Sequence, residues 1–269
     1  MSFRRATALT IAGTDPTGGA GIQADIKTML ANGVYAMSVI TAVIAQNTRG
    51  VFDLCNLSEE LIRKQIDAIF TDIPPDAVKI GMIGKLSQAR GIAEALRHYK
   101  ARNIVLDPVL GASVGRRFMD DPTIREIKRE LFSLSSLITP NIPETEALTG
   151  KTILSQRDME KAAALLSEEY GCAVLIKGGH RLQDTDDLLY DKGLFIWFRG
   201  KRIDNPNTHG SGCTLSSAIT SNLAKGKTLA ESVEQAKAYL RHAIEKRLDL
   251  GQGNGPIDHG SSLSGQFIQ

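Results

Sequence analysis

Cysteine is scarce in this chain, and its three cysteines, Cys55, Cys172 and Cys213, are far apart and form no CxxC pair. A disulfide framework or a zinc cluster is therefore not expected, and a reducing, cytoplasmic location is predicted. No apolar run approaches the roughly 18 residues that cross a bilayer, and the first residues lack the pattern of a signal peptide. Neither sign of charge is in excess, because 32 Lys and Arg oppose 30 Asp and Glu. Neither nucleic acid nor a membrane is therefore expected as a partner.

The remaining composition is that of a globular protein, with 42% hydrophobic and 23% charged residues among 269. Apolar runs alternate with stretches whose apolar residues recur at helical spacing. This alternation predicts an α/β fold with a central, mainly parallel sheet flanked by helices on both faces. No linker interrupts it, so residues 1–259 are expected to form a single domain and residues 260–269 a flexible tail. The expected strands are Ala6–Ala12, Val39–Ala45, Ala77–Ile80, Asn103–Leu106, Ser136–Thr139 and Ala173–Lys177.

The last third of the chain predicts a hairpin and two helices. Leu188–Tyr190 and Leu194–Phe198 flank Asp191-Lys192-Gly193, a pattern typical of a small antiparallel hairpin at one edge of the sheet. The helices are expected near residues 212–225 and 228–248, and apolar residues follow one face of the second.

Two familiar nucleotide-binding signatures fail on their context. Residues 19–24 match the GxGxxA fingerprint of dinucleotide-binding folds, but the next expected strand carries no acidic residue to hold a ribose hydroxyl. Residues 150–152 and 226–228 each read Gly-Lys-Thr, yet the leading glycine of a phosphate-binding loop is absent from both. We interpret both tripeptides as turns after helices.

A hydrolase signature is weak for a similar reason. Residues 111–115 fit GxSxG, the turn that presents a nucleophilic serine such as Ser113, with His209 or His259 as the base. In that turn a helix starts directly after the serine. Here six residues, 116–121, intervene before Pro122, which is suited to the first turn of the next helix. We therefore do not expect a hydrolase.

The most informative local motif is Asn207–Leu215, in which Gly210 and Gly212 bracket Ser211 and an apolar helical stretch follows. Backbone N–H groups converge at such a helix start, and the helix dipole favours an anion there. A phosphate or a developing oxyanion would fit, and the same field is expected to lower the pKa of Cys213 and to favour its thiolate. The alternative is a glycine-rich cap with a structural cysteine.

Polar side chains also follow three of the expected strands. Asp107 follows the strand 103–106, Asn141 and Glu144 follow 136–139, and Lys177 ends 173–177. The carboxyl ends of parallel strands line one crevice. Carboxylates there can organise Mg²⁺ and its waters, and a lysine can bind phosphates, so their joint position favours a metal–nucleotide site.

Together these segments resemble the hydroxymethylpyrimidine/phosphomethylpyrimidine kinases, thiamine-biosynthesis enzymes of the ribokinase-like superfamily. The resemblance spans about the first 256 residues in register, and so many ordered motifs make it specific. It implies a ribokinase-like sheet, ATP and Mg²⁺ as cofactors, a small pyrimidine alcohol as substrate and a homodimer. The matching segments are residues 12–25, 45–48, 79–82, 107–109, 139–144, 177–180, 207–214 and 251–256.

The resemblance also implies roles at the acceptor end. Asp25 and Gln46 would hydrogen-bond the aminopyrimidine, while Met82 and Val109 would pack on its ring. Cys213 stands where most ribokinase-like enzymes keep an aspartate base, so it would accept the proton of the hydroxymethyl group.

Further roles are implied at the phosphate end. Asn141 and Glu144 resemble the family's NxxE element, with Glu144 holding Mg²⁺ through water. Asp107 and Lys177 would lie beside the triphosphate of ATP, and residues 210–213 match the anion hole.

The chain departs from the family pattern in residues 110–119, a loop expected to close over the site, and in Ser211, where threonine is more usual. Two alternatives remain at this point. Pyridoxal also bears a hydroxymethyl group on a flat ring, so the chain could be a pyridoxal kinase, alone or as a second activity. A nucleotide-binding regulator without catalysis is the other, but a reactive thiol would have no use in it.

Overall fold

The computed structural model describes residues 4–110, 120–179, 185–261 and 263. Three features expected from the sequence fall outside them: the GxSxG turn with Ser113, the 110–119 loop beyond Leu110, and most of the tail. His180, which ends one of the matching motifs, is also outside the described residues.

Within the described residues, eight strands form the main sheet in the order β10-β9-β8-β7-β6-β5-β1-β2. Neighbours from β2 to β8 are parallel, whereas β8, β9 and β10 pair antiparallel at one edge. The predicted sheet and its edge hairpin are therefore confirmed. The strands are β1 Thr7–Ala12, β2 Tyr35–Ile40, β5 Ala77–Ile80, β6 Ile104–Leu106, β7 Leu137–Ile138, β8 Ala173–Ile176, β9 Asp187–Asp191 and β10 Leu194–Phe198.

The strand predicted for Val39–Ala45 is wrong, because the chain leaves the main sheet at Thr41. The amide of Thr41 donates to the carbonyl of Ala12 over 2.9 Å, and its hydroxyl donates to the carbonyl of Met82 over 2.8 Å. The chain then forms β3 (Ala42–Asn47), which pairs with β4 (Gly50–Asn56) in a separate antiparallel sheet. The alternating exposure along β3 is typical of a strand with one wet face.

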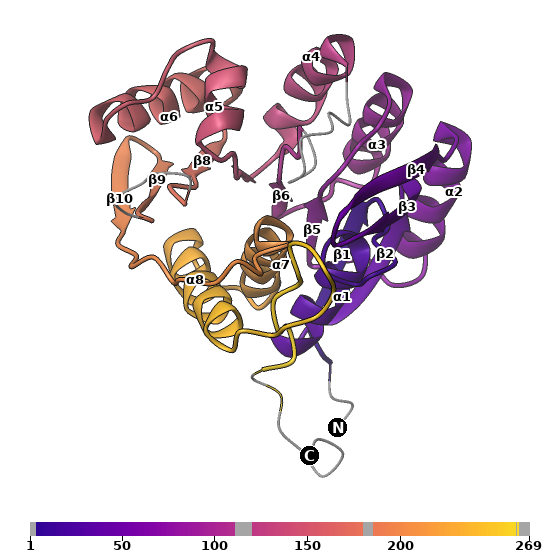
Figure 1. Ribbon diagram of the computed structural model, residues 1–269. Coiled ribbons are helices and arrows are strands. Elements are labelled where there is room, and N and C mark those ends of the chain that lie inside the picture. The colour runs from indigo at the N-terminus through magenta and orange to yellow at the C-terminus, as the bar shows by residue number, and fades with distance from the viewer. Residues whose placement is uncertain (1–3, 111–119, 180–184, 262, 264–269) are drawn as a thin grey trace.

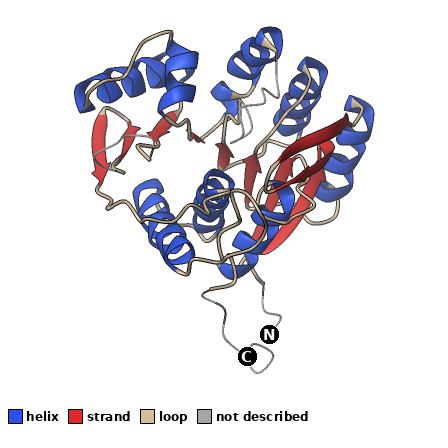
Figure 2. Cartoon of the chain, in the orientation of Figure 1, coloured by secondary structure: helices blue, strands red, loops and turns tan. Residues whose placement is uncertain are grey.

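Helices cover both faces of the main sheet (Figures 1 and 2). One face carries α1, α7 and α8, whose Leu215, Ile219 and Val233 pack against strand residues such as Val105. The other face carries α2 to α6 and a short 3₁₀ turn, Phe132–Leu134. The helices are α1 Gly21–Ala31, α2 Glu59–Phe70, α3 Leu86–His98, α4 Asp121–Glu130, α5 Ile142–Thr149, α6 Gln156–Tyr170, α7 Ser211–Ala224 and α8 Leu229–Glu245.

Local sequence explains where several helices begin and end. The side chains of Asn141, Ser155 and Thr228 each accept a hydrogen bond from the backbone N–H of the third helical residue. The acidic side chain of that residue in turn accepts one from the backbone N–H of the cap. Gly150 ends α5 in a left-handed conformation, which confirms that residues 150–152 form a turn after a helix. Among the described residues no helix has the length and apolar character to cross a membrane.

Candidate active site

A cavity of about 1470 Å³ opens at the carboxyl ends of the parallel strands. Its wall comes from the β1–α1 loop, β3, the segments after β5, β6 and β8, and the first turn of α7. On the far side it extends between β10 and α8. This is the edge at which open parallel sheets bind their ligands.

The first turn of α7 forms the centre of the cavity wall. Its cap, Gly210, has φ of 79°, and a Cβ there would lie 1.7 Å from the carbonyl oxygen of Gly19. Only glycine fits such a position. Ser211, Gly212 and Cys213 follow and all line the cavity. The first N–H groups of a helix have no partner within it, so this turn can receive an anion.

Asp15 and His209 fasten this turn to the β1–α1 loop. His209 Nε2 lies 2.8 Å from Asp15 Oδ2, and the carboxylate also accepts hydrogen bonds from Thr17 and from the amide of Ala20. Burial would raise the pKa of Asp15, but these hydrogen bonds outweigh it and lower the pKa to about 2. This pair was not expected from the sequence. The only signal in the sequence was that Asp15 and His209 both lie within segments that resemble the kinase family.

Lys177 and Asp107 lie directly beside the α7 turn. Lys177 Nζ donates to Asp107 Oδ1 over 2.8 Å, and a methyl group on Gly212 would lie 3.5 Å from Lys177 Nζ and 3.4 Å from Asp107 Oδ2. Burial would lower the pKa of Lys177, but Asp107 and Glu144 raise it above its ordinary value. A permanently charged ammonium therefore adjoins the predicted anion hole.

Asn141 and Glu144 form the capping box at the start of α5. Glu144 Oε2 accepts the amide of Asn141 over 2.8 Å and lies 3.9 Å from Lys177 Nζ. Burial raises the pKa of Glu144, Lys177 opposes this, and Asp107 adds to it. Both residues line the cavity. The structure thus brings together all four polar residues predicted at the strand ends.

The same cavity also has an apolar slot. Met82 and Val109 pack with Ile44 and Val51, which come from β3 and β4. Gln46 lines the cavity beside them, after a register shift between Ala45 and Gln46 in β3. Such a bulge turns a side chain away from the regular alternation. The slot has apolar faces and one amide, as a flat heteroaromatic ring requires.

Asp25 does not line the cavity, so the prediction that it contacts the pyrimidine needs correction. It is fully buried, and its carboxylate accepts hydrogen bonds from Ser217 over 2.7 Å, from Thr10 over 2.6 Å and from Lys79 over 2.8 Å. These partners occupy both oxygens. Of these residues Lys79, to which no role was assigned from the sequence, is the one that lies at the cavity wall, although its side chain has no exposed surface.

The predicted ionisation of Cys213 is also wrong. Burial raises the pKa of its thiol to about 11, although Lys79 and the amide of Gly21 act to lower it. The negative charges of Asp25 and Asp107 add to the rise. The helix terminus alone therefore does not produce a thiolate, and at neutral pH the resting residue is a thiol.

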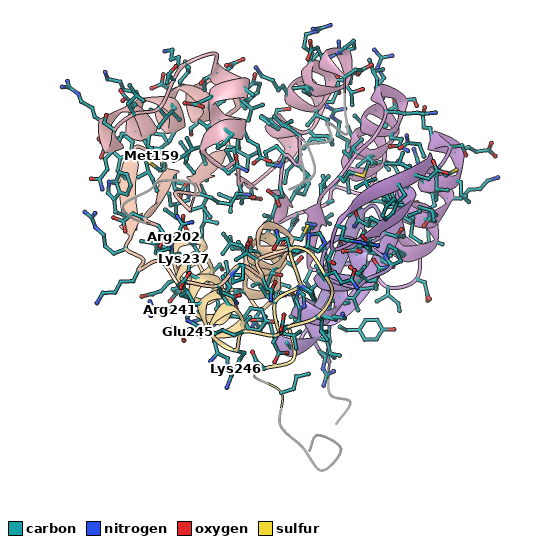
Figure 3. All side chains as sticks on the ribbon, viewed as in Figure 1. Met159, Arg202, Lys237, Arg241, Glu245 and Lys246 are labelled. Atoms are coloured by element: carbon teal, nitrogen blue, oxygen red, sulfur yellow. The ribbon has the colours of Figure 1, made fainter. Side chains whose placement is uncertain are left out.

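The far end of the cavity is basic, which the sequence analysis missed. Figure 3 shows Lys237 and Arg241 on α8, with Arg202 above them on the segment that follows β10. Lys237 pairs with Asp187. The signal was the run Arg199-Gly200-Lys201-Arg202 after the hairpin. The basic residues that line this end are Arg199, Lys201, Arg202, Lys237 and Arg241.

The donor set at the phosphate end suits Mg²⁺ bound with its waters. Within the described ranges, no group of three or more His, Cys, Asp or Glu side chains could hold a metal by itself. Mg²⁺ commonly binds through one or two carboxylates and completes its shell with water and substrate phosphates. Glu144 at the cavity wall fits that mode.

Sequence comparison identifies the relatives of this chain. Residues 15–258 match the family model described as phosphomethylpyrimidine kinase. The chain is 43% identical over 254 residues to the hydroxymethylpyrimidine/phosphomethylpyrimidine kinase of Bacillus subtilis, with 94% of each chain covered. It is 45% identical over 258 residues to the thiamine biosynthesis bifunctional protein of Geobacter sulfurreducens, covering 96% of this chain and 53% of that protein. The chain thus spans about half the length of the bifunctional relative.

Solved structures give the same fold. A phosphomethylpyrimidine kinase from Clostridium difficile 630 is 42% identical with a TM-score of 0.81, over 89% of this chain and 100% of that one. An ADP complex of Bacillus subtilis pyridoxal kinase is 33% identical with a TM-score of 0.89, over 96% and 98%. The resemblance found in the sequence motifs is therefore confirmed: the chain belongs to the phosphomethylpyrimidine kinase family.

Proposed function

We propose that the chain, a hydroxymethylpyrimidine/phosphomethylpyrimidine kinase of thiamine biosynthesis, acts at this cavity in two successive steps. It would transfer the γ-phosphoryl group of ATP to the hydroxymethyl group of 4-amino-5-hydroxymethyl-2-methylpyrimidine, and then phosphorylate the monophosphate to the diphosphate. The observation that carries the assignment of the site is the position of Cys213. It lines the same cavity as the apolar slot for the ring and the Lys177–Asp107 pair beside the α7 turn.

The residues divide the work between acceptor and nucleotide. Met82 and Val109 would hold the two faces of the pyrimidine, and Gln46 would hydrogen-bond its polar edge. Asn141 and Lys177 would bind the triphosphate, with Lys177 as a point charge on its oxygens, and Asp107 would lie beside it through its ion pair with Lys177. The basic end between β10 and α8 would receive the rest of the nucleotide.

Phosphoryl transfer depends on position and charge more than on covalent help. The hydroxymethyl oxygen forms a bond to the γ-phosphorus as the bond to the bridging oxygen breaks and ADP leaves. The resting Cys213 thiol first loses its proton to solvent; the resulting thiolate then accepts the hydroxyl proton of the substrate and becomes a thiol again. The N–H groups of Gly212 and Cys213 would stabilise negative charge on the transferring group, whereas that of Ser211 already donates to the carbonyl of Thr208 over 3.1 Å.

Glu144 would hold Mg²⁺ through water beside the phosphates. When bound, the ion supplies positive charge that neutralises the phosphate oxygens as charge moves onto the leaving group. Glu144 itself keeps its place through the hydrogen bond from the Asn141 amide.

We also propose that the chain is a cytoplasmic homodimer. Val43 is 52% and Phe52 64% exposed on the β3–β4 sheet, and Tyr35 on the neighbouring β2 is 51% exposed. Exposed apolar side chains of this kind are typical of an interface. The thiol state of all three cysteines supports a reducing compartment. Light scattering of the wild type and of Phe52→Glu tests the dimer: the proposal expects two chains and one chain, respectively.

The direct test of the reaction uses purified protein with Mg·ATP and the pyrimidine alcohol, with products followed by mass spectrometry. Monophosphate that converts to diphosphate is expected. Cys213→Ala is expected to lose most of kcat while the affinity for ATP changes little. Full turnover by that variant would refute the base role, and absence of either product would refute the two-step assignment.

Pyridoxal kinase activity is a second candidate, because pyridoxal kinases match the fold with TM-scores as high as 0.89. The same assay with pyridoxal distinguishes the two. Pyridoxal phosphate as the sole product would leave the mechanism and change the substrate. Gln46 and Met82 favour the pyrimidine, and Gln46→Ala is expected to raise KM for the pyrimidine more than for pyridoxal.

A further inference from the structure

Lys79 occupies an unusual place for a lysine. It lies in the middle of β5, a strand whose four residues are all buried, and its own side chain has no exposed surface. Taking an ammonium group out of water costs free energy that an ion pair at best recovers, so an apolar residue would serve stability as well. A charge held at this position therefore calls for another reason.

The ammonium group is held by a network that joins four elements. Lys79 Nζ donates to Asp25 Oδ2 over 2.8 Å, and Asp25 on α1 also accepts hydrogen bonds from Thr10 on β1 and Ser217 on α7. Ser217 lies one helical turn after Cys213, on the same face of α7. The network thus fixes the lysine relative to the turn that carries the thiol.

The Lys79 ammonium group lies close to the backbone of Gly81. A Cβ on Gly81, two residues further on, would lie 2.6 Å from Lys79 Nζ. Cys213 lines the cavity, Lys79 lies at the cavity wall with no exposed surface, and the charges of the two side chains interact. The ammonium remains protonated, since Asp25, Cys213 and Asp107 raise the pKa of Lys79 against the effect of burial.

We propose that Lys79, held by Asp25, is a positioning residue for Cys213 whose buried positive charge stabilises the sulfur anion when the thiol loses its proton. The proposal rests on the function of Cys213 as the proton acceptor. The charged groups that interact with the sulfur come from four elements: Lys79 on β5 and Lys177 after β8 favour the anion, whereas Asp25 on α1 and Asp107 after β6 oppose it. Lys79 has the largest effect among these charges.

The test measures alkylation of each cysteine by iodoacetamide at pH 8.5, with the labelled peptides quantified by mass spectrometry. The thiolate is the reacting species, and one pKa unit changes its population tenfold. In Lys79→Met, Cys213 should react roughly tenfold more slowly than in the wild type, because a favourable charge is lost and Asp25 is left unpaired. In Lys79→Met/Asp25→Asn the rate should fall between the two, since both opposing charges are absent.

The chain contains its own controls. Cys55 is exposed and Cys172 is buried, so Cys55 should react equally in every variant, and reaction of Cys172 would reveal unfolding. Ser217→Ala removes one hydrogen bond but keeps both charges, so its rate should stay near that of the wild type. If Cys213 reacts as fast as the wild type, or faster, in both Lys79 variants while Cys172 stays protected, the proposal is overturned.

The readout also separates this proposal from the proposed function. Alkylation reports the thiol without any turnover, so slow alkylation of the Lys79 variants supports the electrostatic coupling whatever the substrate is. An active Cys213→Ala enzyme would refute the base role instead. A pH profile of kcat/KM for the double variant, displaced to higher pH than that of the wild type, would be expected only if both ideas hold.

Discussion

The two lysine–aspartate pairs of this molecule have the same chemistry and different surroundings. Lys79 and Asp25 are joined over 2.8 Å, and neither side chain has exposed surface. Lys177 and Asp107 are also joined over 2.8 Å, but 14% of the lysine side chain is exposed at the cavity wall. Both lysines interact electrostatically with Cys213. Position, rather than composition, therefore decides what each pair can do.

The Lys79–Asp25 pair is the sealed pair: because neither side chain is exposed, it cannot contact a ligand. Its influence on a ligand must therefore pass through a neighbouring residue. The Lys177–Asp107 pair is the open pair. When phosphate oxygens arrive, Lys177 can bind them with its other N–H groups while keeping contact with Asp107. The first turn of α7 lies between the two and presents Cys213 to both. The difference suggests that the sealed lysine sets the state of the thiol and the open one binds the reacting group.

The largest expected effect is on stability, in Lys79→Met. This substitution leaves the Asp25 carboxylate buried without its counter-ion, which commonly costs about 3–5 kcal/mol. The double variant Lys79→Met/Asp25→Asn removes both charges and should recover most of that loss. Urea unfolding measures the free energies. Lys177→Met should cost less than Lys79→Met because Asp107 lies beside the solvent of the cavity; equal losses would contradict the comparison.

The second expected effect is on catalysis, in Lys177→Met. Loss of one preorganised group that stabilises transition-state charge lowers kcat by about 10²–10³-fold. Initial rates with saturating Mg·ATP and pyrimidine alcohol test this. Lys151→Met is the matched control, since Lys151 is exposed and does not line the cavity. A Lys177→Met enzyme within a few-fold of wild type would remove the open pair from the mechanism.

The sheet was predictable because buried strands carry a strong signal. Apart from Val39–Ala45, each expected strand agrees with the structure within one residue at either end. The separate β3–β4 sheet was missed for a physical reason. Its strands have one wet face, and the hydrogen bonds of Thr41 that turn the chain out of the main sheet connect residues up to 41 positions apart. Periodicity within a short window contains no such information.

The site was predictable where its residues follow strands directly. Asp107, Asn141, Glu144 and Lys177 meet because parallel strand ends share an edge. Asp25 and Lys79 were not assigned correctly, since a motif tells which residues occur together but not which of them reaches the cavity. The pKa of Cys213 depends on burial and two aspartates, which raise it, against two lysines, which lower it, and these groups come together only on folding.

A third prediction concerns the effect of acid pH on His259, a buried residue that contacts α7. His259 Nε2 lies 3.0 Å from the hydroxyl of Thr214, and burial lowers the pKa of His259 from 6.5 to about 4. The folded state therefore resists a proton that the unfolded state accepts. The resulting stability is complete above pH 6.5 and is lost as the pH falls toward 4, a change of about 3 kcal/mol at most.

His259→Gln should therefore reduce the difference in unfolding free energy between pH 7.5 and 4.5, as urea titrations at the two values measure. The exposed His98 provides the control, since His98→Gln should leave that difference as it is in the wild type. An unchanged pH dependence of the unfolding free energy in His259→Gln would mean that the folded protein does not exclude a proton from His259.

The smallest and sharpest effect is the pH dependence of catalysis by Cys213 itself. With a pKa of about 11, only about one thiol in 10⁴ is ionised at pH 7 in the free enzyme. If the thiolate is the required base, kcat/KM should rise about tenfold per pH unit between pH 7 and 9. Cys213→Asp supplies a carboxylate at this position, so its profile should be flatter over that interval. A flat wild-type profile would mean that Cys213 acts by position alone, and the sealed lysine would then have no anion to stabilise.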